Sequence, residues 1–181
     1  MSQTTVTIRQ ATLPDAQEIA EVHVRAWQWA YRGLIDDDYL DHLSDKLDQR
    51  IASYQAQIPN LPPQNRWWVA EQDGHIVGFA MTGLSRDSDV PPSTAEVFAI
   101  YLAQQVAGKG VGRALFARAV DELRNQGYEQ AVLWVLASNT RARKFYEAAR
   151  WTPDGARKTE KMPGNIQIEE VRHSIVLKHT D

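Results

Sequence analysis

The order of apolar and polar residues along the chain predicts alternating strands and helices. Apolar residues recur every three or four positions over 16–30 and 111–123, a spacing typical of helices with one buried face. Residues 131–137 form a nearly unbroken apolar run, as expected for a strand at the centre of a sheet. The other predicted strands span 6–10, 67–71, 75–82, 96–102, about 157–161 and 166–177, and the helices span 16–30, 39 to about 57, 113–125 and 139 to about 149.

Several short signals mark where these elements begin and end. Thr12 and Asp15 have the spacing of a capping box at the start of the first helix. Asp73 and Gly74 stand between two strand-like runs and predict a hairpin turn. The polar, proline-containing segment 83–93 is predicted to be a mobile loop. The order of elements favours one domain of the α/β (α+β) class, over residues 1–181, built around a mixed sheet.

Composition and charge narrow the classes of function. The chain has 181 residues, a formal net charge of −3 and no cysteine. A thiol nucleophile and a cysteine-ligated metal are therefore excluded. There is no basic stripe and no long apolar run, so neither nucleic acid nor a membrane is expected as a partner, and a cytoplasmic location is predicted. The histidines, at positions 23, 42, 75, 173 and 179, lack metal-binding spacing, and no metal is expected.

A glycine-rich turn is the strongest chemical signal in the chain. Residues 107–112 read Ala-Gly-Lys-Gly-Val-Gly and lie between a predicted strand and a predicted helix. Glycines let successive backbone N–H groups face one concavity, and the helix start adds unpaired donors and a positive dipole end. The P-loop pattern does not fit, and the dinucleotide pattern has Arg113 where its third glycine should stand. A phosphate cradle and an ordinary tight turn both remain open.

The wider sequence resembles the Gcn5-related N-acetyltransferase (GNAT) superfamily. The resemblance rests on AEVFAIYLAQQVAGKGVGRALFARAV, followed later by LWVLASNTRARKFYEAARW, and on the N-terminal IRQATLPDAQEIAEVHVRAWQWAYRGLI. It covers most of the chain and is most specific in the first two motifs, taken in that order. It implies a central, mostly antiparallel twisted sheet of six or seven strands with about four helices. In that fold the strands 96–102 and 131–137 splay apart.

Two positions depart from the family pattern. Ala107 stands where members usually have Gln or Arg, so a side-chain contact to phosphate is absent there. The backbone cradle does not depend on that side chain, and Lys109 or Arg113 can replace part of its charge. Arg150 replaces the glycine that usually ends the last helix in the left-handed region.

The resemblance implies that acetyl-CoA is the acyl donor and that the glycine turn holds its pyrophosphate. The backbone of the splayed strand would pair with the pantetheine arm, and one of its N–H groups would polarise the thioester carbonyl. Asn139 has two open roles, as a helix cap and as a cofactor contact. The residues expected at the cofactor are Ile100, Tyr101, Leu102, Ala107, Gly108, Lys109, Gly110, Val111, Gly112, Arg113, Asn139 and Tyr146.

The catalytic candidates are Tyr146 and Glu96. The family motif places a tyrosine hydroxyl near the CoA sulfur, so Tyr146 would protonate the leaving thiolate; the alternative is an aromatic core residue. Glu96 lies four residues before Ile100 on the predicted strand, so the two side chains are expected to share a face. It would serve as general base, unless it is only a solvated residue at the strand start. His23 is a weaker candidate on the apolar side of the first helix.

The amine acceptor is expected beside the first two helices. Trp27 and Tyr31 are predicted to bind it, although helical aromatic residues often belong to the core. The leading prediction is an acetyl-CoA-dependent N-acetyltransferase that moves an acetyl group directly to a primary amine of a small molecule or peptide. The alternative is a non-catalytic acyl-CoA-binding sensor on the same fold. A homodimer is expected only because the resembled family commonly forms one.

Overall fold

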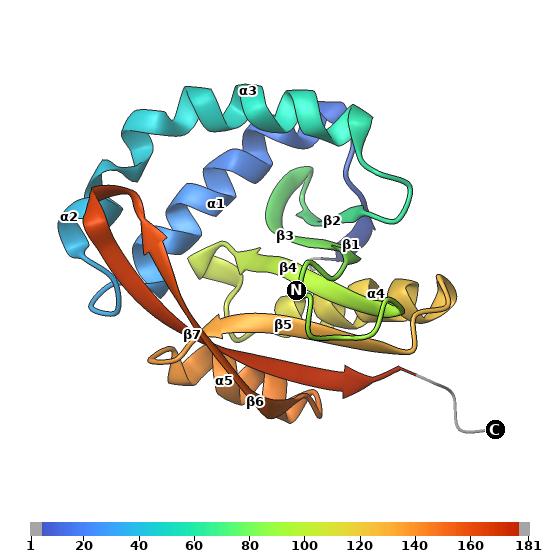
Figure 1. Ribbon diagram of the computed structural model, residues 1–181. Coiled ribbons are helices and arrows are strands. Elements are labelled where there is room, and N and C mark those ends of the chain that lie inside the picture. Colours follow the sequence, from blue (N-terminus) through green and yellow to red (C-terminus); the bar gives the residue numbers. More distant parts are fainter. Residues whose placement is uncertain (1–4, 178–181) are drawn as a thin grey trace.

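The computed structural model describes residues 5–177 and contains a single seven-stranded sheet of order β1-β2-β3-β4-β5-β7-β6 (Figure 1). Only β4 and β5 are parallel, and every other neighbouring pair is antiparallel, as the resemblance implied. The strands are β1 (Val6–Gln10), β2 (Arg66–Gln72), β3 (His75–Leu84), β4 (Thr94–Leu102), β5 (Gln130–Leu136), β6 (Thr152–Met162) and β7 (Ile166–Val176). The helices are α1 (Ala16–Ala30), α2 (Asp37–Asp41), α3 (Leu47–Gln57), α4 (Val111–Asn125) and α5 (Thr140–Ala148).

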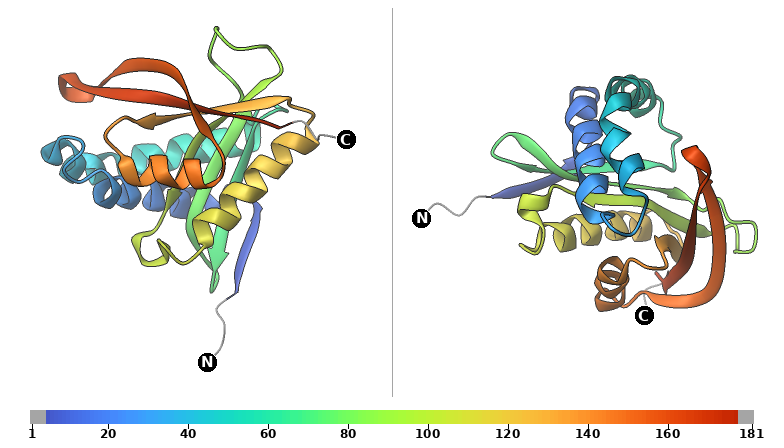
Figure 2. Two further views of the ribbon diagram at one scale, coloured as in Figure 1. Left: turned by 90° about the horizontal axis from the view of Figure 1, so that it is seen from below. Right: turned by 90° about the vertical axis from the view of Figure 1, so that its left-hand side faces the viewer.

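Helices cover both faces of this sheet (Figure 2). The apolar faces of α1 and α3 pack on one side, around residues such as Ile19 and Phe79. On the other side α4 packs through Leu115 and Leu123, and α5 flanks β5 and β7. None of the helices within residues 5–177 is long and apolar enough to cross a membrane.

The predicted elements are present, and most differences lie at their ends. The helix predicted over 39–57 is divided into α2, a 3-10 segment (His42–Lys46) and α3. Its start is fixed by Asp36, whose carboxylate accepts the Tyr39 amide, so this acid caps a helix. The hairpin at Asp73 and Gly74 is confirmed, with φ values of 54° and 80°.

The strands β4 and β5 separate after a short region of pairing, as expected for the splayed pair. They pair only from Thr94 to Val97 on β4. At that point β4 also carries a bulge against β3, because Thr82 is opposite Val97 and Met81 is opposite Ala99. Phe98 is the extra residue. A bulge bends and twists a strand, so it turns the rest of β4 away from β5.

The bulge corrects one prediction about this strand. Ala95 and Val97 pack on the α4 side, and so do Ile100 and Leu102, whereas Ala99 and Tyr101 pack on the α1 side. The alternation of side chains is therefore reversed at Phe98. Glu96 and Ile100 point to opposite faces, and the expectation that they share one is wrong.

The loop between β3 and β4, which the sequence predicted to be mobile, is linked to the sheet by charged hydrogen bonds. Arg172 of β7 is 7% exposed and donates to both Asp87 and Asp89 at 2.7–2.9 Å. It also donates to Asp154 on β6, and the indole of Trp134 donates to Asp87. Charged hydrogen bonds of this kind are among the stronger ones in proteins. They fix the loop against β5, β6 and β7.

The last helix ends in the left-handed conformation without a glycine. Arg150 has φ = 67°, and the Trp151 amide donates to the carbonyl of Tyr146 at 3.0 Å. These are the features of a Schellman cap. The substitution of arginine for the family's usual glycine has therefore left the cap geometry in place.

Candidate active site

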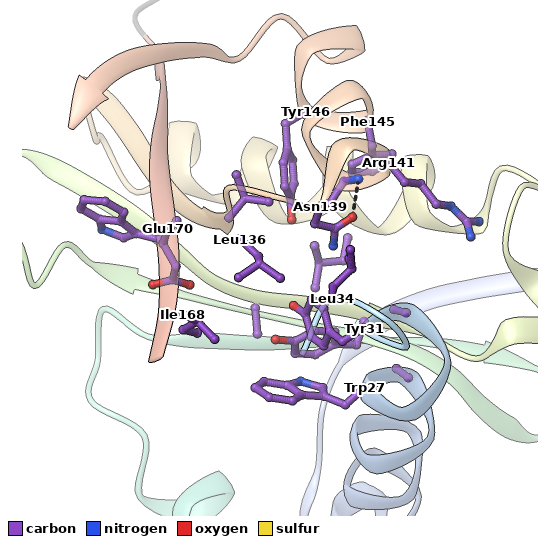
Figure 3. A pocket seen from close by; sticks show the side chains of 18 of the residues that line it. Trp27, Tyr31, Leu34, Leu136, Asn139, Arg141, Phe145, Tyr146, Ile168 and Glu170 are labelled. Atoms are coloured by element: carbon purple, nitrogen blue, oxygen red, sulfur yellow. Dashed lines mark hydrogen bonds between the residues drawn. The ribbon is translucent and has the colours of Figure 1, made fainter. Parts of the chain in front are cut away.

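A cleft of about 1110 Å³ opens where β4 and β5 diverge. Its walls are the end of α1, the splayed strands, the starts of α4 and α5, and the hairpin of β6 and β7 (Figure 3). The structure brings nearly all of the predicted site residues to this cleft. Only Lys109 and Val111 do not line it; those that do are Trp27, Tyr31, Glu96, Ile100, Tyr101, Leu102, Ala107, Gly108, Gly110, Gly112, Arg113, Asn139 and Tyr146.

The glycine turn forms one end of the cleft and presents backbone donors there. Gly108 and Gly110 have φ values of 76° and 87°, which only glycine adopts without strain. The first helical hydrogen bond of α4 runs from the Ala114 amide to the Gly110 carbonyl. The amides of residues 111–113 precede that bond and have no partner inside the helix. Of these three residues, Gly112 and Arg113 line the cleft, so an anion at this end would meet their N–H groups and the positive end of the helix dipole.

Two amides of the same turn point inwards. The Ala107 amide donates to the Gln104 carbonyl, and the Lys109 amide donates to the Val106 carbonyl. The cradle is therefore narrower than the whole 107–113 segment. Gly112 serves packing as well, since a Cβ there would lie 2.7 Å from Leu102 Cδ1.

Cationic side chains lie at this end of the cleft. Arg113 and Arg141 line it, and the Arg141 guanidinium stacks 4.9 Å from the ring centroid of Trp29. The Trp29 indole in turn donates to the Leu102 carbonyl at 3.2 Å, which ties α1 to the end of β4. Arg143 instead donates to the Ala137 carbonyl, so it braces the start of α5.

Asn139 is a helix cap. Its Oδ1 accepts the Ala142 amide at 3.1 Å, the bond drawn as a dashed line in Figure 3. The side chain also lines the cleft, beside Tyr146. The side-chain oxygen of Asn139 is thus used in capping α5, while its side-chain NH2 group is not part of the cap.

The ring of Tyr146 is packed among other aromatic residues, and its hydroxyl reaches the cleft. Its ring packs against Phe116 and Phe145, with centroids 5.5 Å and 5.4 Å away. Its hydroxyl points into the cleft towards Tyr31 (Figure 3). Burial raises the pKa of this phenol, so it stays protonated at neutral pH and can act as a hydrogen-bond donor.

An aromatic wall stands opposite Tyr146. Trp27 and Tyr31 of α1 meet edge to face at 4.9 Å, and Trp27 lies 6.1 Å from the ring of Tyr101. Burial raises the pKa of Tyr31 to about 12. Trp27 and Tyr31 therefore pack together and also line the cleft.

The predicted base Glu96 is already engaged. Its side chain is 2% exposed, and Arg86 donates to Oε1 at 2.6 Å and to Oε2 at 3.4 Å. The Arg86 amide donates to Oε2 as well. Both oxygens of this carboxylate are therefore already occupied by donors from Arg86.

His23 is packed away from the cleft. Its Nδ1 lies 2.6 Å from the Tyr54 hydroxyl and 3.3 Å from Arg50, and its ring stacks 5.0 Å from that of Tyr101. Burial and the charge of Arg50 lower the pKa of His23 to about 3. The ring is therefore neutral at neutral pH and is a much weaker base than an ordinary histidine.

Residues missed by the sequence analysis form the other end of the cleft. They come from β5, β6 and β7: Trp134, Lys158, Glu160, Ile168 and Glu170. The alternating residues of β7 showed that Ile168 and Glu170 share a face. Nothing in the sequence showed that this face meets α1 and β4.

Within residues 5–177, no group of three or more His, Asp or Glu side chains is arranged to hold a metal ion.

Comparisons with known proteins agree with this architecture. The family described as "Acetyltransferase (GNAT) family" matches residues 19–150. A Bacillus subtilis protein described as "Uncharacterized N-acetyltransferase YuaI" is 29% identical over 92% of this chain and 90% of its own. An N-acetyltransferase of Staphylococcus aureus superposes with a TM-score of 0.73 at 22% identity, covering 97% of this chain and all of that one. The PaiA N-acetyltransferase of Thermoplasma acidophilum, solved with coenzyme A, has a TM-score of 0.65 at 21% identity, with 92% and 98% covered.

Proposed function

Because the chain belongs to the acetyltransferase (GNAT) family, we propose that it transfers an acetyl group from acetyl-CoA to a primary amine of a small molecule or peptide. One observation carries the proposal. A helix start with unpaired amides, a strand freed from its neighbour and the Tyr146 hydroxyl all face a single cleft. This arrangement can hold an anionic carrier at one end and place its acyl group near a proton donor.

The donor end suits the diphosphate of coenzyme A. The amides of residues 111–113, the helix dipole and the guanidinium of Arg113 would bind the phosphates. Beyond Val97 the edge of β4 is not paired with β5, so its backbone groups can pair with the pantetheine arm. That the structurally similar PaiA protein was solved with coenzyme A supports this assignment.

The proposed reaction is direct transfer, because the chain has no cysteine to carry an acyl group. The ammonium of the acceptor loses one proton, and its nitrogen attacks the thioester carbonyl carbon. The tetrahedral intermediate then breaks its C–S bond, and Tyr146 donates a proton to the leaving thiolate. The second proton of the nitrogen returns to Tyr146, which restores the neutral phenol.

A sensor that binds acyl-CoA without turnover is the second candidate. The observation that favours it is the ion pair of Glu96 with Arg86, which engages the predicted base. A sensor would bind acetyl-CoA as an enzyme does and would release no coenzyme A in the presence of any amine.

Calorimetry with acetyl-CoA, followed by a coenzyme A release assay, tests the proposal. The amine panel is tryptamine, spermidine, an aminoglycoside, free amino acids and peptides with a free N-terminus. We expect binding, and turnover of at least one amine well above hydrolysis. Binding without turnover would favour the sensor, and no heat at tens of micromolar protein would rule out both candidates.

A further inference from the structure

We propose that Glu170 of β7 is the carboxylate that binds the ammonium of the acceptor and removes its proton. The inference rests on the proposed N-acetyl transfer and assigns a base to it. It is drawn from the position of Glu170 in the cleft, from its partners and from the contrast with Glu96.

Glu170 lies on the wall of the cleft opposite the glycine turn of residues 107–112. It lines the cleft, and Figure 3 shows its carboxylate near Ile168 and Leu136. Its side chain is 16% exposed, so it is desolvated but still reachable from the cleft. Its charge is close enough to contribute to the raised pKa of Tyr31, which in turn faces Tyr146.

The partners of Glu170 leave it able to accept a proton. Lys158 Nζ lies 3.2 Å from Oε2 and 4.5 Å from the ring centroid of Trp134, yet this buried oxygen accepts no well-formed hydrogen bond from the described residues. Glu96, by contrast, has both oxygens held by Arg86. Of these two cleft carboxylates, Glu170 can be protonated without breaking a two-pronged ion pair.

The charges around Glu170 favour an added cation. Glu160 lies close by on β6 and shares Lys158, whose Nζ is 3.8 Å from its carboxylate. Further along β7, Arg172 is held by the aspartates of the β3–β4 loop, and Arg86 is paired with Glu96. Lys158 thus neutralises only one of its two neighbouring carboxylates. Burial and Glu160 raise the pKa of Glu170, and Lys158 opposes them.

These surroundings define the proton's path. The acceptor's ammonium binds beside Glu170, with its carbon skeleton against Trp27 and Tyr31. One N–H proton moves to the carboxylate and later to water. The neutral nitrogen then attacks the thioester carbonyl carbon. When the tetrahedral intermediate breaks its C–S bond, Tyr146 protonates the thiolate and takes up the second proton of the nitrogen.

Glu170→Gln tests this assignment against the matched control Glu169→Gln. Glu169 is the preceding residue, on the opposite face of β7, where it forms an exposed ion pair with Arg157. The assay is release of coenzyme A with the fastest amine of the panel. We expect Glu170→Gln to lower kcat/KM at least 50-fold and the control to stay within twofold. Both variants should keep the acetyl-CoA affinity of the parent.

The pH profile separates base catalysis from a structural role. The parent should lose kcat/KM as the pH falls through the pKa of Glu170, because a protonated carboxyl cannot accept a proton. This acid limb should vanish in Glu170→Gln and remain, displaced, in Glu170→Asp. Full activity of Glu170→Gln, or a loss confined to KM with the acid limb kept, would overturn the assignment and leave the proposed function standing. A parent that turns over no amine would instead overturn the function itself.

Discussion

The two ends of the cleft are built in different ways. The donor end is a short, continuous segment whose contribution comes from backbone amides at the start of α4. The acceptor end is assembled from side chains of α1, β4, β5, β6 and β7. Its supporting ion pair between Asp87 and Arg172 joins residues 85 positions apart. Backbone donors suit a ligand group common to a whole family, whereas scattered side chains can vary with the acceptor.

The ends also differ in charge. Arg113 and Arg141 line the donor end beside a positive helix terminus. Glu160 and Glu170 line the acceptor end with Lys158 between them, and Lys161 and the Arg86–Glu96 ion pair also line the cleft. An anionic donor and a cationic acceptor would therefore be drawn to opposite ends, and their reactive groups would meet near Tyr146.

The largest expected effect lies at the junction of the two ends. Tyr146→Phe removes the proposed proton donor without changing the packing of the ring, so kcat should fall about 100-fold. Acetyl-CoA affinity by calorimetry should change less than twofold. Tyr128→Phe is the control, because Tyr128 does not line the cleft. An unchanged kcat for Tyr146→Phe would remove this residue from the chemistry.

Arg172→Leu is expected to damage the acceptor end selectively. It leaves Asp87 and Asp154 without their cation, and charged hydrogen bonds of this kind contribute about 2–3 kcal/mol to the free energy of unfolding. Urea unfolding measures that loss, and the KM for the amine should rise while acetyl-CoA affinity is kept. The exposed Arg157→Leu, which breaks a pair with Glu169, should lower stability by less than about 1 kcal/mol. Equal losses in the two variants would contradict the account.

Gly110→Ala is expected to damage the donor end instead. An alanine at φ = 87° is strained by about 1–2 kcal/mol. If the turn changes conformation to relieve this strain, its amides move, and acetyl-CoA binding should weaken roughly tenfold. Gly127→Ala places the same strain at the far end of α4, where φ is 84°. It should lower stability similarly and leave the affinity unchanged. Matched affinities for the two variants would show that the turn does not bind the donor.

The smallest expected effect concerns His23, which lies outside both ends. Its folded pKa of about 3 is below the ordinary value of 6.5, so below pH 6.5 the unfolded chain binds a proton that the folded chain does not. Stability should therefore fall by roughly 1 kcal/mol between pH 7.5 and 6 and continue falling towards pH 3. His23→Gln should flatten this fall in urea titrations, and the exposed His75→Gln should not. An equal change in the parent and in His23→Gln between pH 7.5 and 6 would show that His23 is not neutral in the fold.

The same contrast explains what the sequence could predict. The glycine turn, the Asn139 cap and the order of elements along the chain depend on local patterns or on a family motif, and the structure agrees with them. The prediction that Glu96 shares a face with Ile100 was wrong because a single bulge at Phe98 reverses the alternation of side chains along β4. No local feature of the sequence marks that bulge. Glu170 was missed because its role depends on which strands surround β7, a long-range property of the sheet.

A crystal structure with acetyl-CoA tests the central claim most directly. The diphosphate should lie about 3 Å from the amides of residues 111–113, with the acetyl group between the hydroxyls of Tyr146 and Tyr31. A diphosphate bound elsewhere, with those amides facing water or protein, would contradict the claim that the start of α4 positions the acyl donor.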